Sequence, residues 1–236
     1  MFALYRLPRS KSRRVNHVAY NRKAAAGTAL TPGPFVPLLP LFPLDVVLFP
    51  GTPLPLHIFE PRYKEMISEC LASQTVFGVV RALEQGIAEI GCTAEIVAVT
   101  KKYPDGRLDL VTEGRERFEV VEVNQDRAFL QAEIIRIPNE TDAAAKKDVA
   151  RAIDLHRQIL ALAGASPDIP DTAPVALSFH LAGSLPLDLD FKQKLLATRS
   201  EGQRILALAS HLETILPALR RAARAREKAG GNGHVH

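Results

Sequence analysis

Histidines, acids and glycines are the residues of this sequence whose spacing could support chemistry. His57 and Glu60 are three residues apart, which on a helix would place both on one face and could hold a metal ion. Pro55 and Pro61 flank the pair, and proline excludes a helix interior, so we expect extended chain and a structural histidine at a strand edge. No glycine is followed by lysine, which excludes the phosphate-binding loop G-x-x-x-x-G-K-[ST]. The sequence therefore predicts no metal site and no cofactor.

The cysteines and the other histidines do not form a catalytic set either. Cys70 and Cys92 lack a C-x-x-C spacing and are too few for a disulfide framework, so we expect two buried thiols in a reducing cytoplasm. His156 and His180 fall in helical sequence, where we expect them at a seam between helices. No run of about 18 apolar residues predicts a membrane span, and the N-terminus lacks the apolar core of a signal peptide. We therefore expect a cytoplasmic protein that is not an enzyme.

Aromatic side chains beside prolines are the remaining candidates for a functional surface. Side chains next to proline turns often reach solvent, and an exposed apolar patch can hold an extended peptide. On this basis we predict a peptide-binding role for Phe49, His57, Phe59 and Tyr63. We assign three further aromatic residues of the same half to the core, namely Phe42, Phe77 and Phe118.

The elements that must position these residues are β-rich in the first half. Residues 39–63 hold six prolines among large apolar residues, which predicts short extended segments joined by rigid turns. A helix is predicted from Pro61 to about Ser73, because proline suits a first helical turn. Alternating apolar residues and turn signals predict further strands at Thr75–Arg81, Cys92–Tyr103, Leu108–Thr112, Arg117–Val123 and Ala128–Ile137.

This half also contains a glycine between two strands and a pair of arginines among acids. Gly114 is expected to break the chain between two of the predicted strands. Arg115 and Arg117 alternate with glutamates, which indicates a solvated strand face.

The second half changes to a helical period of 3.6 residues. We predict a first helix capped by Thr141 or Asp142, and a last helix opened by a capping box of Ser200 with Gln203. A second helix is expected to open at Asp171 or Thr172. The four predicted helices span about residues 141–164, 171–184, 190–198 and 200–219.

Strands followed by helices predict a segregated α+β fold rather than alternating βαβ units. The sequence divides into a disordered basic arm (1–37), a β-rich subdomain (38–138), a helical bundle subdomain (139–219) and a flexible basic tail (220–236). The net charge of +4 belongs to the ends, because residues 41–216 hold 18 basic and 25 acidic residues, a net charge of −7. A basic folded surface for nucleic acid is therefore not indicated.

Several motifs, in order, resemble the N-terminal, substrate-recognition domain of Lon proteases over roughly residues 38–216. They are LFPL at 41–44, VLFPG at 47–51, LPLHIFEPRY at 54–63, FGVV at 77–80, IGCTA at 90–94, DGR at 105–107, GRERF at 114–118 and KQKLL at 192–196. The resemblance implies a partly open, PUA-like β-barrel followed by a helical bundle. It implies the recognition module alone, because the sequence ends before the ATPase and Ser-Lys peptidase domains of Lon would begin.

Three hypotheses follow for function. The first is a non-catalytic recognition module that binds exposed hydrophobic segments of unfolded or extended polypeptides, alone or with a separate protease, at an affinity on the order of micromolar. The second is a PUA-like nucleic-acid-binding module, because such folds often bind RNA and the arms are basic. The third is an enzyme with its pocket where barrel and bundle meet. A deep polar cleft there would favour an enzyme, and a shallow apolar groove would disfavour it.

Overall fold

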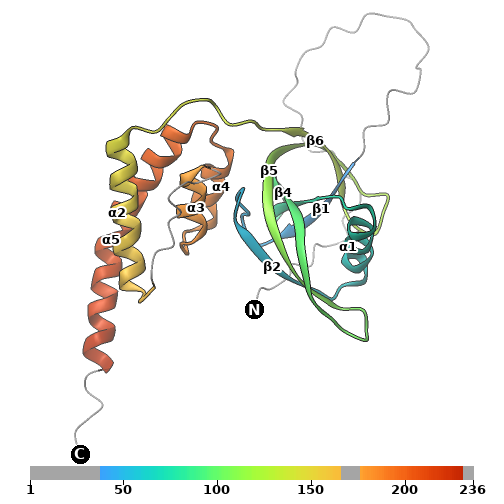
Figure 1. Ribbon diagram of the computed structural model, residues 1–236, viewed down its shortest axis with the longest axis horizontal. Helices are drawn as coiled ribbons and strands as arrows, with labels where there is room; N and C mark the ends of the chain where they lie inside the picture. The colour runs from blue at the N-terminus through green and yellow to red at the C-terminus, as the bar shows by residue number, and fades with distance from the viewer. Residues whose placement is uncertain (1–37, 166–175, 231–236) are drawn as a thin grey trace, which may run out of the picture.

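A strand-rich half and a helical half follow one another in the computed structural model, which describes residues 38–165 and 176–230 (Figure 1). The order of strands first and helices second matches the predicted α+β class. The predicted N-terminal arm, residues 1–37, lies outside the described residues.

The strand-rich half is one mixed sheet of six strands. They are β1 (Leu39–Leu44), β2 (Pro53–Ile58), β3 (Phe77–Leu83), β4 (Gly86–Lys102), β5 (Leu108–Asn124) and β6 (Gln131–Arg136), in the spatial order β2-β5-β4-β3-β1-β6. β1 and β3 pair in parallel, and the other pairs are antiparallel. β6 also pairs with the second half of β5, so the sheet curls on itself, while β2 remains an edge strand. The result is a partly open barrel rather than a closed one.

Helix α1 (Pro61–Ser73) covers the inside of this sheet. It begins at a proline, as predicted, and its buried residues recur at helical spacing: Tyr63, Met66, Ile67 and Cys70. They pack with Phe42 and Phe77, which are buried as expected, and Phe118 is buried in a neighbouring cluster. Both thiols are buried as predicted, and burial raises the pKa of Cys92 to about 12.

Strand β5 runs without interruption through Gly114, where we expected a break. The turn at residues 49–52 lies directly on this glycine: Gly51 N–H donates to the Gly114 carbonyl at 2.8 Å, and Gly114 N–H donates to the Thr52 carbonyl at 3.0 Å. A Cβ at position 114 would stand 2.1 Å from the Phe49 carbonyl oxygen. The glycine therefore permits a close backbone approach instead of ending a strand.

The helical half contains α2 (Lys146–Leu162), α3 (Leu177–Gly183), α4 (Leu189–Ala197) and α5 (Glu201–Gly230). The expected cap of the first helix is wrong, because α2 begins at Lys146, after Ala145. Asp142 instead accepts hydrogen bonds from Ser200 Oγ and from the Gly202 N–H, at the start of α5. Ser200 Oγ accepts from the Gln203 N–H, which is one of the two hydrogen bonds of the predicted capping box.

The second predicted helix is described only in part, and the last helix is longer than predicted. The predicted start of the second helix, at Asp171 or Thr172, lies outside the described residues, and the described helix α3 begins at Leu177. Helix α5 continues through Pro217 to Gly230, so residues 220–230 are helical where we expected a flexible tail.

Phe179 of α3 joins the two halves. Its ring stacks on Phe49 with centroids 5.1 Å apart, and the Arg204 guanidinium lies 4.3 Å from the Phe179 ring centre. Arg117 of β5 donates to the Leu196 and Thr198 carbonyls, each at 2.7 Å. The prediction of a solvated Arg117 is therefore wrong: its side chain is buried against the helical half, and burial lowers its pKa to about 10.

Candidate functional site

The four predicted peptide-binding residues divide into two buried and two exposed side chains. Phe49 and Tyr63 are 1% and 4% exposed, so the expectation that they reach the surface is wrong. Phe49 lies in the turn that packs on Gly114, and its side chain belongs to the hydrophobic core of the helical half, where it stacks on Phe179. Tyr63 packs on Phe42 with ring centroids 4.1 Å apart, and burial raises its pKa to about 12. Both residues support the scaffold.

His57 and Phe59 do reach the surface, and their positions follow from the alternation of β2. Pro53, Pro55 and His57 are exposed, whereas the alternate residues Leu54 and Ile58 are buried and Leu56 is half-buried. Phe59 continues the exposed series and is 46% exposed, with its ring centre 5.9 Å from that of His57. The exposed side of β2 therefore presents prolines and rings to solvent.

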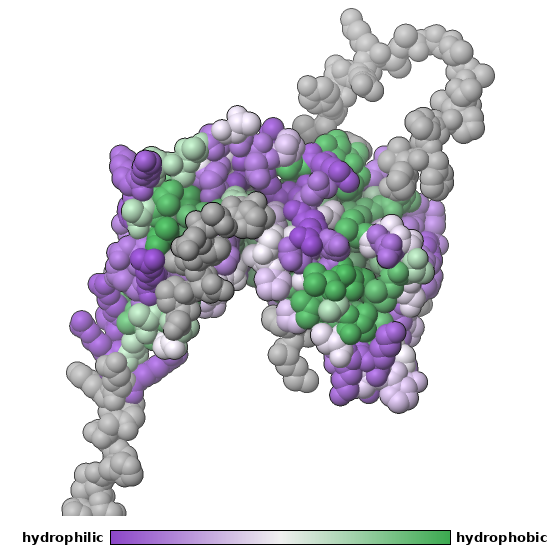
Figure 2. Space-filling view, in the orientation of Figure 1, coloured by the Kyte–Doolittle hydropathy of each residue, from purple (hydrophilic) through white to green (hydrophobic). Residues whose placement is uncertain are grey.

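Neighbouring strands extend this exposed side. Pro55 pairs with Val111 of β5, which pairs with Ala98 of β4. A register shift between Ile96 and Ala98 leaves Val97 without a partner on β5, and its side chain is 56% exposed. We call this side of β2, β5 and β4 the outer face; it comprises Pro53, Pro55, His57, Phe59, Glu95, Val97, Ala98, Lys101, Tyr103, Asp109, Val111 and Glu113. Figure 2 shows apolar surface on the strand-rich half, bordered by hydrophilic residues.

A polar network fixes His57 on the outer face. His57 Nδ1 lies 2.5 Å from Asp109 Oδ1, and the Tyr103 hydroxyl donates to Asp109 Oδ2 at 2.8 Å. Because an ionised carboxylate can only accept, His57 Nδ1 carries the proton. The hydrogen bonds from His57 and Tyr103 lower the pKa of Asp109. The histidine is thus held by a strand neighbour, as expected for a structural residue at a strand edge.

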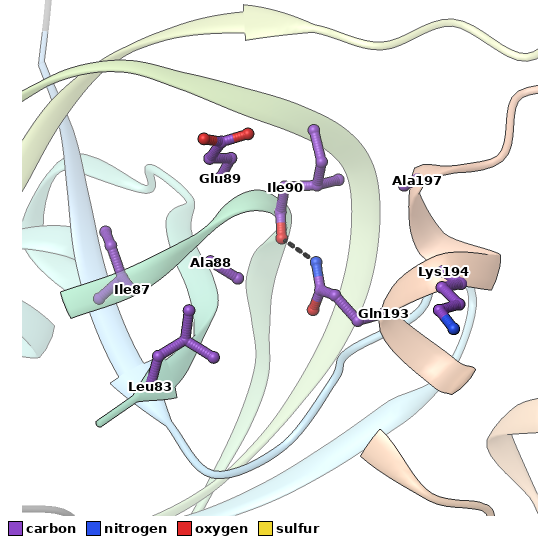
Figure 3. Close-up of a pocket in the computed structure, with 8 residues that line it drawn as sticks. All are labelled: Leu83, Ile87, Ala88, Glu89, Ile90, Gln193, Lys194 and Ala197. Carbon is purple, nitrogen blue, oxygen red and sulfur yellow. Dashed lines mark hydrogen bonds between the residues drawn. The ribbon is translucent and has the colours of Figure 1, made fainter. Parts of the chain in front are cut away.

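A separate hollow of about 380 Å³ lies where the two halves meet, between β3, the start of β4 and α4 (Figure 3). Gln193 Nε2 donates to the Ile90 carbonyl at 2.8 Å, while Gln193 Oε1 is buried without a partner in the described part of the chain. The lining is otherwise mostly apolar, with Glu89 and Lys194 as its titratable members: Leu83, Ile87, Ala88, Glu89, Ile90, Gln193, Lys194 and Ala197. The hollow therefore lacks the convergent acid and base groups that the enzyme hypothesis requires.

Residues 38–165 and 176–230 contain neither a metal-binding cluster nor a membrane-spanning helix. No group of three or more histidine, cysteine or acidic side chains in these ranges is arranged to hold a metal ion. Within the same ranges, no helix is both long and apolar enough to span a bilayer.

Sequence comparison finds one family model that matches most of the chain. The model describes the ATP-dependent protease La (LON) substrate-binding domain and matches residues 38–214. Among curated proteins, the Lon protease of Flavobacterium johnsoniae is 26% identical over 200 residues, which is 77% of this chain and 24% of that protein. Lon protease 2 of Myxococcus xanthus is 29% identical over 179 residues, 68% of this chain and 22% of that protein. The chain thus matches about a quarter of the length of these relatives.

Solved structures give the same result for the fold. The crystal structure of a Lon N-terminal domain protein from Xanthomonas campestris superposes with a TM-score of 0.60 at 27% identity, covering 74% of this chain and 98% of that one. The N-terminal domain of the Mycobacterium avium complex Lon protease superposes with a TM-score of 0.57 at 20% identity, covering 75% and 98%.

Proposed function

Because this chain belongs to the family of LON substrate-binding domains, we propose that it recognises exposed hydrophobic segments of unfolded or extended polypeptides through its outer face. Its role is recognition without bond cleavage, in the cytoplasm, with a separate protease as a further partner. One observation supports the choice of this surface. Phe59 and Val97, which are 46% and 56% exposed, share one side of the sheet with the exposed Pro53 and Pro55, so that exposed apolar residues of three segments adjoin there.

Binding on this face would rely on apolar contact more than on strand addition. β2 is an edge strand, but Pro53 and Pro55 have no N–H to donate to an added strand. The exposed prolines and rings offer rigid surface that loses little conformational entropy on binding. We therefore expect weak binding, with a dissociation constant on the order of micromolar.

The test is binding of an array of peptides from unfolded proteins, followed by fluorescence anisotropy with the best ligands. The double variant Phe59→Ser with Val97→Ser should bind these ligands about tenfold more weakly, because it removes two apolar side chains from the contact. Ile135→Ser on β6 is the matched control, since Ile135 is 59% exposed outside the outer face. Absence of binding across the array, or equal losses in the control, would contradict the proposal. RNA retention that falls steeply with salt would instead support the nucleic-acid alternative.

A further inference from the structure

One end of the outer face is built around Tyr103 and carries two cations held against its ring. Lys101 Nζ lies 4.6 Å from the ring centre, and the Arg107 guanidinium lies 4.7 Å from it. The Tyr103 hydroxyl donates to Asp109, and the His57 ring contacts Tyr103 edge-on with centroids 5.7 Å apart. The ring is therefore anchored on the sheet and holds both cations on the same side as His57.

Four basic side chains and two acidic ones, Asp105 and Asp109, lie around this end, which leaves a net charge of +2. Lys101 and Arg107 accompany Tyr103. Lys102 alternates to the other side of β4, and Lys64 reaches the hairpin turn from α1, where its Nζ donates to the Asp105 carbonyl at 2.8 Å. Asp105 is already paired with Arg107 Nε at 2.7 Å. Among the residues described, none of these three lysines forms an ion pair. We call this group, Lys64, Lys101, Lys102, Tyr103 and Arg107, the cationic end.

The opposite end of the outer face has the other sign of charge. Arg115 pairs with Glu95, at 2.6 Å, and with Glu113. Two carboxylates around one guanidinium leave a net negative charge there. Between the two ends lie the apolar residues Pro55, Val97 and Val111, so the face is apolar in the middle and charged oppositely at its ends.

We propose that the outer face selects polypeptide segments in which acidic side chains follow a run of apolar residues, with the acidic side chains on the cationic end. This inference rests on the proposed function and adds the chemistry of the ligand to it. Charge complementarity of this kind sets orientation and partner choice more than overall affinity. A single-stranded RNA would also meet cations and a ring, but its phosphates repeat along its whole length and would meet the apolar middle and the acidic far end. The arrangement therefore favours a polypeptide.

The test uses three labelled peptides that share one apolar sequence and end in aspartates, asparagines or lysines, with binding measured by anisotropy. The aspartate peptide should bind about fivefold to tenfold more tightly than the asparagine peptide, and the lysine peptide more weakly than either. The advantage should shrink as NaCl is raised from about 0.05 M to about 0.5 M. Lys101→Glu with Lys102→Glu should abolish the advantage of the aspartate peptide over the asparagine peptide. Lys146→Glu with Lys147→Glu, two exposed lysines of α2, is the matched control and should change nothing.

The experiment distinguishes failure of the charge selection from failure of peptide binding itself. Equal affinity for the aspartate and asparagine peptides would overturn the charge selection and leave the proposed function standing. No binding of any of the three peptides would overturn both. Displacement of the aspartate peptide by polyuridine from the unmodified protein, and not from the Lys101→Glu, Lys102→Glu variant, would reassign the cationic end to nucleic acid.

Discussion

His156 should make the stability of this protein fall as the solution is acidified, well above the pH at which carboxylates protonate. The side chain is 1% exposed, on α2, with Nε2 2.7 Å from Ser184 Oγ. Ser184 Oγ donates its own proton to the Leu181 carbonyl, so Nε2 is the donor and Nδ1 is unprotonated. Nδ1 is buried without a partner among the described residues. A second proton would therefore be placed on a buried atom with no acceptor.

Burial, with smaller contributions from His180 and Arg157, lowers the pKa of His156 from 6.5 to about 4. Between these two values the unfolded chain binds a proton that the native protein does not. The free energy of unfolding should therefore fall as the pH drops from 6.5 towards 4, by about 1.4 kcal/mol per pH unit at most. Over the whole window the loss is about 3 kcal/mol, and above pH 6.5 the stabilisation is fully present.

The assay is urea unfolding followed by circular dichroism at several pH values between 7 and 4, with His156→Gln as the comparison. Glutamine keeps an N–H for Ser184 and cannot take up a proton in this range. Both proteins share every other titrating group, so the difference between their unfolding free energies isolates His156. The difference should change by about 3 kcal/mol across the window, in the direction that favours the variant at low pH. Parallel pH profiles would refute the reasoning.

Two further predictions concern the junction of the two halves. Gly114→Ala should lower the free energy of unfolding by about 3 kcal/mol or more, because the new Cβ would stand 2.1 Å from a backbone oxygen. Gly164→Ala is the control: no atom lies within 4 Å of its Cβ, and its φ of 69° alone should lower the free energy of unfolding by about 1–2 kcal/mol. Equal losses in urea unfolding would contradict the close approach. Arg117→Met should lower the free energy of unfolding by about 2–4 kcal/mol, because the buried carbonyls of Leu196 and Thr198 lose their hydrogen-bond donor. The same variant should be cleaved faster by proteases between residues 137 and 145. The exposed neighbour Arg115→Met should change stability by about 0.5 kcal/mol, and similar behaviour of the two variants would argue against the junction described.

Local sequence was sufficient to predict those elements whose structure depends on residues a few positions apart. Pro61 and the apolar spacing after it predict α1 at its observed bounds. The alternation along β2 places Pro55 and His57 on one side and Leu54 on the other. The capping box of Ser200 with Gln203 marks the start of α5. Backbone restrictions and side-chain periodicity act within a few residues, so they can be read without knowing the fold.

The tertiary structure alone decided which of these residues are covered. Phe49 and Phe59 both lie beside prolines, but α3 packs on Phe49 and buries it, whereas Phe59 contacts the His57 ring and stays 46% exposed. Asp142 has a capping residue's chemistry, yet the N–H groups it satisfies belong to a helix that starts 59 residues later. Arg117 alternates with glutamates like an exposed residue and is buried, because carbonyls of a distant segment surround it. Burial is a property of what packs against a side chain, and that partner is set by long-range contacts that no local pattern contains.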